Sequence, residues 1–278
     1  MIIREMIIEE LNNRGYKAEA QNNIKNGVVF EGIRIMNDSN VAPVIYVDEI
    51  IRSAEEENKS FNEVVSAVIS IYESHNTIDF NIDELFDRDF VLGHLYIGLQ
   101  RESTEELVKR PCAELDGIES YLYIRRDKDD RESYSVKLNM GLLARTNISV
   151  EEAWKSAEQN TKAETTIQSM AYVMAEIMGM EYSEELENMV PYPLYVLSNE
   201  SKTKGASAVL NKEVLAQFGR KHNTEKIVVL PSSIHEMLLI PYTEEMSLEE
   251  FSAMVTEVNG NEVAPEERLT DRAYIVTL

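Results

Sequence analysis

The stretch IESYLYIRRDKDDRESYSVKL, residues 118–138, decides the fold class. From 118 to 125 the residues alternate with the period of two expected of a β-strand, with Tyr121 and Tyr123 on one side and Ile118, Ser120, Leu122 and Ile124 on the other. The polar turn Asp127–Asp130 separates this strand from a second one at 134–138. Strands joined by so short a turn must pair antiparallel, because a parallel crossover needs about a dozen residues or more. The stretch therefore predicts a hairpin and an α+β fold, not a doubly wound parallel one.

The rest of the chain repeats this rhythm of two strands followed by a helix. Candidate units are 16–58, 118–160, 193–219 and 226–258, and they share no clear sequence identity. Strands are expected at 28–35, 193–198, 207–210, 226–230, 235–240 and 273–276, with helices at 164–178 and 211–219. The predicted architecture is a set of mixed, mostly antiparallel sheet layers.

Helix starts are marked by four capping boxes of the form Ser-x-x-Glu. In such a box the serine accepts from the amide three residues on, while the glutamate reaches back to the serine amide. The pairs are Ser60 with Glu63, Ser103 with Glu106, Ser149 with Glu152, and Ser247 with Glu250.

Three regions are expected along the chain. Residues 1–15 form an amphipathic helix whose apolar stripe faces either the core or a partner. Residues 16–190 and 191–278 are two α+β regions, or one continuous domain. The stretch around Glu181–Val190, which ends in Pro191-Tyr192-Pro193, is the best candidate for the boundary.

Composition is that of an ordinary globular protein, with 44% apolar and 28% charged residues among 278. None of the apolar runs approaches the roughly 20 residues needed to cross a bilayer, and the N-terminus lacks a secretory signal pattern. Cys112 is the single cysteine, so an internal disulfide is excluded, as expected in a reducing compartment. We therefore expect a cytoplasmic protein and interpret Cys112 as a small buried thiol.

Fifty acidic residues against 27 basic ones give a net charge of −23, spread along the whole chain. Such a charge repels nucleic-acid phosphates and anionic membranes, which argues against direct binding to either. It suits a basic partner protein, or mimicry of nucleic acid toward a nucleic-acid-binding protein. Solubility alone also explains it.

No catalytic, metal or nucleotide motif is complete. The histidines at 75, 94, 222 and 235 are never three or four residues apart, so the helical zinc pair is missing. The glycines form neither a dinucleotide fingerprint nor a phosphate-binding loop. We expect no cofactor and no metal.

The most unusual segment is LPSSIHE, residues 230–236, between two apolar strands. Ser232, Ser233, His235 and Glu236 are the only candidate catalytic residues that the sequence offers, because a histidine can activate a serine within hydrogen-bond reach. The structural interpretation is a turn whose serines satisfy loop amides. Neighbouring strand residues point to opposite faces, so His235 and Glu236 are not expected to orient each other.

At this segment the chain resembles the bacterial domain of unknown function 5688 family, known mainly from Firmicutes. The resemblance lies in VLPSSIHE (229–236), EVN (257–259), VAPEERL (263–269), Asp271 and Tyr274, with support from YVLSN (195–199), Gly205-Ala206, residues 142–152, Asn160, Ser169-Met170 and APVIY (42–46). The pattern departs at Gly260, where a bulkier residue is expected. The resemblance implies one architecture over most of the chain. It implies no reaction, because the family has no assigned activity.

Three functions compete at this stage. The first is a non-catalytic protein-binding or adaptor module that meets a basic partner. The second is a hydrolase-like enzyme that uses His235 with Ser232 or Ser233. The third is a regulatory or anti-defence factor that mimics nucleic acid. The oligomeric state is left open.

Overall fold

The computed structural model describes residues 2–37, 42–75, 81–128, 132–183 and 192–278. The chain folds as two compact units, Met1–Asp83 and Glu84–Leu278. Every strand pairing in the described ranges is antiparallel, which confirms the predicted α+β fold. The expected boundary near 190 falls within 184–191, outside the described residues.

The first unit is a sheet of order β1-β2-β3 covered by helices. Its elements are α1 (Arg4–Asn13), β1 (Lys17–Lys25), β2 (Val28–Met36), β3 (Val44–Tyr46), α2 (Asp48–Glu56) and α3 (Phe61–His75). Ile7 and Leu11 of α1 are fully buried in one core with Ile33 and Val65. The apolar stripe of the N-terminal helix therefore faces the core of its own unit.

The second unit contains two sheets, of which the smaller has the order β4-β6-β5 with β7 paired to β6. Its strands are β4 (Leu95–Arg101), β5 (Lys109–Pro111), β6 (Ile118–Lys128) and β7 (Glu132–Lys137). The accompanying helices are η1 (Ile82–Phe86, which crosses the boundary between the units), α4 (Arg88–His94), α5 (Met140–Arg145) and α6 (Val150–Ala163). The predicted hairpin is β6–β7, with Tyr123 opposite Lys137. Its turn, 129–131, lies outside the described residues.

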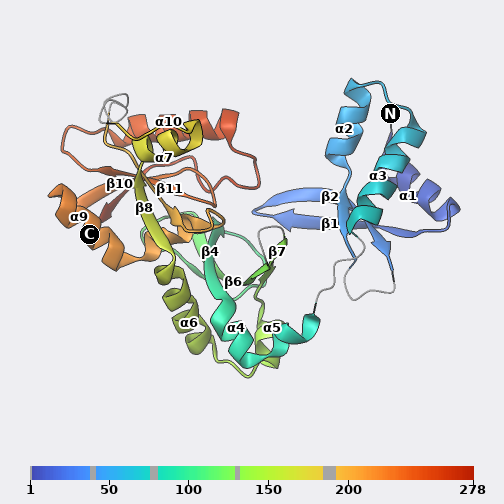
Figure 1. Ribbon diagram of the computed structural model, residues 1–278, viewed down its shortest axis with the longest axis horizontal. Helices are drawn as coiled ribbons and strands as arrows, with labels where there is room; N and C mark the ends of the chain where they lie inside the picture. The colour runs from blue at the N-terminus through green and yellow to red at the C-terminus, as the bar shows by residue number, and fades with distance from the viewer. Residues whose placement is uncertain (1, 38–41, 76–80, 129–131, 184–191) are drawn as a thin grey trace. The chain divides into compact units, whose positions relative to one another are not determined.

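The larger sheet has the order β12-β10-β11-β9-β8. Its elements are β8 (Thr165–Ser169), α7 (Met170–Met178), β9 (Tyr195–Asn199), η3 (Gly205–Leu210), α9 (Lys212–His222), β10 (Lys226–Pro231), β11 (Met237–Pro241), α10 (Leu248–Glu262) and β12 (Tyr274–Thr277). Figure 1 shows α7 and α10 on the same side of this sheet.

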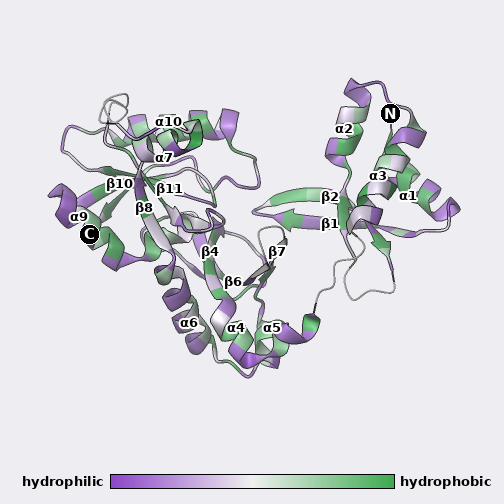
Figure 2. Cartoon of the chain, in the orientation of Figure 1, coloured by the Kyte–Doolittle hydropathy of each residue, from purple (hydrophilic) through white to green (hydrophobic). Residues whose placement is uncertain are grey.

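Both faces of the larger sheet are covered, which explains the unbroken apolar runs in its strands. Along β10, Ile227 and Val229 join the core that contains Phe218 of α9. Val228 and Leu230 point the other way and join the core that contains Phe251 of α10. Figure 2 shows hydrophobic and hydrophilic residues alternating along α10, as expected of a helix with one buried face.

Three of the four capping boxes begin helices as predicted. Ser60, Ser149 and Ser247 accept from the amides of Glu63, Glu152 and Glu250 at 3.4, 3.1 and 3.3 Å. Only at Ser60 do the described contacts show the return bond, from the Ser60 amide to Glu63 Oε2 at 2.8 Å.

Three local predictions are wrong. The expected helix 164–178 begins only at Met170, because the β-branched run Thr165–Ile167 pairs with β9 as a strand. The expected strand 207–210 belongs to the 3-10 helix η3, in which all residues but Leu210 are buried. The box at Ser103 begins no helix, because the Ser103 hydroxyl is held in a polar cluster described below.

Among the described residues, no helix combines the length and apolar character that crossing a bilayer requires.

Candidate functional site

The turn between β10 and β11 holds the four candidate residues found in the sequence. Ser233 is 9% exposed, and its Oγ accepts from the His235 amide at 3.0 Å. The Ser233 amide donates to the carbonyl of Glu236 at 3.2 Å. Ser232 Oγ donates to Glu236 Oε1 at 3.4 Å. The two serines thus close the turn with local hydrogen bonds, as serines in turns commonly do.

Both ring nitrogens of His235 have partners, and neither partner is a serine. The Lys204 amide donates to Nδ1 at 3.2 Å, so Nδ1 carries a lone pair and the ring hydrogen sits on Nε2. Nε2 lies 3.3 Å from Glu267 Oε1. The structure therefore supplies an acid that orients the imidazole but leaves no ring nitrogen facing Ser232 or Ser233.

The turn is held in place by the start of η3. The Ala206 amide donates to the Ile234 carbonyl at 3.3 Å, and Ser198 Oγ donates to the His235 carbonyl at 2.8 Å. A Cβ on Gly205 would lie 2.6 Å from the Asn199 nitrogen and 2.8 Å from the His235 carbonyl oxygen. Only glycine fits this approach, so η3 and the turn pack backbone against backbone at this point.

Beside this turn lies an apolar groove between α10 and the larger sheet, which we call the α10 groove. Its cavity volume is about 260 Å³. It is lined by Tyr192, Leu194, Leu230, Pro231, Ser232, Leu238, Ile240, Phe251, Met254, Val255, Val258 and Asn259. Met254 and Val258 are each 46% exposed, whereas Phe251 beneath them is 2% exposed. The groove is thus an open extension of the core, with a partly exposed apolar wall on α10.

The stretch of chain that supplies most of this groove is rich in acidic residues. Between Ile227 and Glu267 there are nine acidic residues and no lysine or arginine. Glu250 and Glu257 are exposed, and they stand four residues before and three residues after Met254. Residues at these spacings are neighbours on a helix surface, so carboxylates flank the apolar wall of the groove. The amide of Asn259, 1% exposed, donates to Thr270 O at 3.0 Å and fixes the end of α10.

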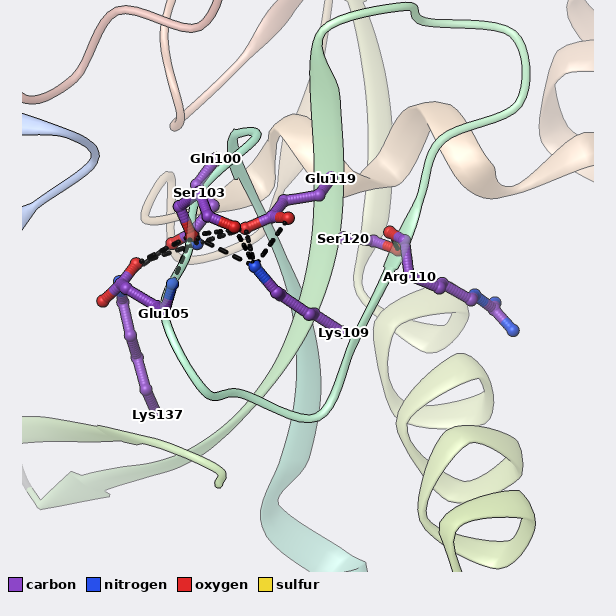
Figure 3. A network of polar contacts seen from close by, with 8 residues as sticks. All are labelled: Gln100, Ser103, Glu105, Lys109, Arg110, Glu119, Ser120 and Lys137. Atoms are coloured by element: carbon purple, nitrogen blue, oxygen red, sulfur yellow. Dashed lines mark hydrogen bonds and ion pairs between the residues drawn. The ribbon is translucent and has the colours of Figure 1, made fainter. Parts of the chain in front are cut away.

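A second polar feature, absent from the sequence prediction, lies on the smaller sheet (Figure 3). We call it the Glu119 cluster; its members are Gln100, Ser103, Glu105, Lys109, Glu119 and Lys137. Glu119 Oε1 accepts from Gln100 Nε2 and from Ser103 Oγ, each at 2.7 Å, and Oε2 lies 3.0 Å from Lys109 Nζ. Lys137 Nζ donates to Glu105 Oε1 at 2.9 Å and to Gln100 Oε1 at 2.8 Å.

The Glu119 cluster is balanced and closed. Two carboxylates face two ammonium groups, and the Ser103 hydroxyl already donates to Glu119. Burial alone would raise the pKa of Glu119, but hydrogen bonds from Gln100, Ser103 and Lys109 outweigh it and lower the pKa. A carboxylate with a lowered pKa is a weak base, so this arrangement is suited to joining β4, β6 and β7 and not to activating Ser103.

The remaining titratable groups do not assemble into a centre. Among the described residues, no group of three or more histidine, cysteine, aspartate or glutamate side chains is arranged to hold a metal ion. Cys112 is 8% exposed, and burial raises the pKa of its thiol to about 11. His94 stacks on Phe90 with ring centroids 4.1 Å apart.

Comparison with known proteins agrees with the resemblance found in the motifs. The model of a family of unknown function, DUF5688, matches residues 1–276. The chain belongs to this family. No curated protein and no solved structure matches it. Five of the residues that carry the DUF5688 resemblance line the α10 groove: Leu230, Pro231, Ser232, Val258 and Asn259.

Sequence reasoning identified the turn of this DUF5688 protein but missed what surrounds it. Glu267, the acid beside His235, is 32 residues away in the chain. The groove combines residues from 192 to 259, which only the fold brings together. The one available signal was charge, because the absence of lysine and arginine from 227 to 267 is visible in the sequence.

Proposed function

We propose that this DUF5688 protein is a non-catalytic binding module that takes up a basic, amphipathic segment of a partner protein in the α10 groove. The observation that carries the proposal is the combination of an open apolar groove with exposed carboxylates beside it, on a stretch of chain (227–267) that has no lysine or arginine. An amphipathic helix laid into such a groove buries its apolar face and keeps its basic face toward the acids.

The apolar part of the groove supplies the binding energy. Met254 and Val258 are each 46% exposed beside the buried Phe251, so a partner side chain placed there removes apolar surface on both molecules from water. Burying one leucine-sized anchor contributes about 1.5–3 kcal/mol. Two such anchors support a moderate affinity once the cost of association is subtracted.

The carboxylates supply selectivity and rate. Glu250 and Glu257 beside Met254 are exposed, so each one attracts a lysine or arginine without being desolvated. Charge complementarity of this exposed kind mainly raises the association rate and is weakened by salt. An acidic amphipathic segment of the same shape is repelled.

The test uses a defined probe, a fluorescein-labelled helical peptide of about 18 residues, long enough to form a helix. It contains only leucine and lysine, with leucine at the spacing of one helix face. A scrambled peptide of equal composition and a leucine–glutamate peptide of equal pattern serve as controls. Fluorescence anisotropy at low and at physiological salt should show saturable binding of the patterned basic peptide alone.

A matched pair of variants locates the binding. Met254→Arg places a long cationic side chain in the groove, whereas Ala253→Arg adds the same charge at an exposed neighbouring position that does not line the groove. Loss of one anchor should raise Kd about 10- to 100-fold for Met254→Arg, while Ala253→Arg should change it by less than about threefold. Equal effects of the two variants, or equal binding of the scrambled peptide, would show that only net charge is at work and would overturn the proposal.

A further inference from the structure

A second cavity of the larger unit lies away from the α10 groove and differs from it in character. It is about 410 Å³ and lies between β5 and α6 on one side and η3 with the start of α9 on the other. We call it the Arg110 cavity. Figure 3 shows the neighbouring residues Lys109 and Arg110 diverging, with Lys109 directed into the Glu119 cluster and Arg110 turned away from it. The cavity is therefore distinct from that cluster.

One wall presents a buried amide donor without a partner. Asn211 is only 4% exposed and lines the cavity. Its Oδ1 caps α9 by accepting from the Val214 amide at 3.3 Å, and no described residue accepts from its Nδ2. Among the described residues, the one side-chain polar atom sealed from solvent without a partner is His222 Nε2. Asn211 Nδ2 therefore keeps some access to solvent, in a residue that is otherwise buried and lines the cavity.

The N-terminus of α9 adds to this donor. The helix has 11 residues, and its first amides, at Lys212 and Glu213, precede the one that Asn211 caps. Uncapped amides and the helix dipole favour a negative group at such an end. Asn211 Nδ2 and the first turn of α9 thus offer hydrogen-bond donors from one side of the cavity.

The charged residues that line the cavity sum to a positive charge, whereas the whole chain is strongly negative. Arg110, Lys162 and Lys212 line it together with two acids, Glu114 and Glu158, a surplus of one base in a chain of net charge −23. Arg110 is half-exposed and has two partners, with Nη2 2.7 Å from Glu158 Oε1 and the guanidinium carbon 4.0 Å from the centre of the Trp154 ring. One N–H bond to Glu158 leaves the other N–H groups of its guanidinium for a ligand.

The rest of the lining is apolar or neutral. Ile97, Leu115, Val209 and Val276 line the cavity. Cys112 joins them as a neutral thiol, since burial raises its pKa to about 11. Ligand pockets commonly combine an apolar wall with a few convergent polar groups, which is the pattern seen here.

We propose that the Arg110 cavity is a binding site for a small organic oxyanion, whose negative group lies between Asn211 at the start of α9 and Arg110, and whose apolar body rests on Ile97 and Leu115. A carboxylate and a phosphate monoester share this chemistry. The site is independent of the α10 groove, and its ligand is not the basic segment proposed there.

Trp154 provides the readout, because it is the only tryptophan in the chain and stacks on Arg110. The full-length protein is titrated with phenyl phosphate, benzoate, benzyl alcohol and inorganic phosphate, and Trp154 fluorescence is followed alongside calorimetry. Binding of phenyl phosphate or benzoate with a 1:1 stoichiometry, and at least about tenfold tighter than benzyl alcohol, supports the proposal. The stronger of the two identifies the class of head group.

The decisive variant is Asn211→Asp. Aspartate still caps α9 but replaces the Nδ2 donor by a carboxylate that repels the ligand. Its matched control is Gln217→Glu, the same amide-to-acid change at an exposed position of α9 that does not line this cavity. Asn211→Asp should raise Kd at least about tenfold, and Gln217→Glu by less than about threefold.

A second variant keeps the test valid if Asn211→Asp disturbs the fold. Lys162→Gln removes an exposed cation at the cavity and should raise Kd severalfold at low salt, an effect that fades at high salt. No binding of either anion at millimolar concentration, binding of benzyl alcohol as tight as that of benzoate, or equal effects of Asn211→Asp and Gln217→Glu would each overturn the proposal.

Discussion

Because η3 lies so close to the 230–236 turn, adding one methyl group at Gly205 should lower the free energy of unfolding markedly. In Gly205→Ala, the new Cβ would contact the backbone nitrogen of Asn199 at 2.6 Å and the carbonyl oxygen of His235 at 2.8 Å. Real Cβ atoms do not approach backbone atoms this closely, so η3 or the turn must move. The hydrogen bond from Ser198 Oγ to the His235 carbonyl, 2.8 Å long, would be lost with that movement.

The magnitude follows from the atoms involved. Overpacking a well-packed core costs about 1–3 kcal/mol, and flexible side chains account for the lower values. Because two of the close contacts at Gly205 are backbone atoms, we expect about 3 kcal/mol. For a domain of about 150–250 residues, each kcal/mol lowers Tm by about 2–4 °C, so Tm should fall by about 6–12 °C.

The matched control is Gly260→Ala in α10. A Cβ at Gly260 meets nothing within 4 Å, and a helical glycine costs about 0.5–1 kcal/mol relative to alanine. The same substitution should therefore raise Tm by about 1–4 °C. Thermal unfolding is followed by the fluorescence of Trp154 in α6, which reports on the unit that contains both glycines. A Gly205→Ala protein that melts with or above the Gly260→Ala protein would refute the close approach.

Three further predictions concern titratable groups. Glu119→Gln should lower the free energy of unfolding by about 1–3 kcal/mol at pH 7. The pKa of Glu119 is lower in the folded protein than in the unfolded chain, so its carboxylate stabilises the fold above the unfolded pKa. This stability is lost as pH falls through the folded pKa. In urea titrations the difference between the two proteins should therefore shrink as pH falls from 5 toward 3. His222→Phe should stabilise the protein by about 1 kcal/mol at pH 7.5, because it removes the unpartnered Nε2. The stabilisation by His222→Phe should be larger at pH 5.5. Burial and the Lys221 charge lower the pKa of His222 in the folded protein, so the unfolded parent chain takes up a proton first and the parent loses stability. Urea midpoints of both proteins at both pH values measure this difference. Cys112, with a pKa near 11, should react with a disulfide reagent at pH 8 far more slowly in the native protein than in urea, and equal rates would contradict its burial.

Predictions of secondary structure from the sequence were correct where no distant residue competes with the local hydrogen bonds. The hairpin β6–β7 follows from alternation around a polar turn, and the boxes at Ser60, Ser149 and Ser247 begin helices. The pair Asn26-Gly27 is a further local signal. Asn26 and Gly27 both have positive φ, 49° and 81°, and this Asn-Gly pair joins β1 to β2 in the hairpin turn that such pairs favour.

Predictions failed where distant residues compete for the same groups. Ser103 has the pattern of a cap, but its hydroxyl gains more from Glu119, Gln100 and Lys109 than from a helix amide. Thr165–Ile167 precede an apolar helical pattern, yet β9 offers them a strand partner. In both cases the contact that forms joins residues far apart in the chain, which local propensity does not describe.

The sequence by itself determined the α+β class, the excess of negative charge, the family and the turn at 230–236. Those properties depend on composition, on short-range periodicity and on motifs that are contiguous in the chain. Only the tertiary structure decided that the His235 ring faces Lys204 and Glu267, that an apolar groove runs beside α10, and that Asn211 and Arg110 line one cavity. These depend on the positions of residues far apart in the chain, which are fixed when strands and helices bury their apolar faces against one another.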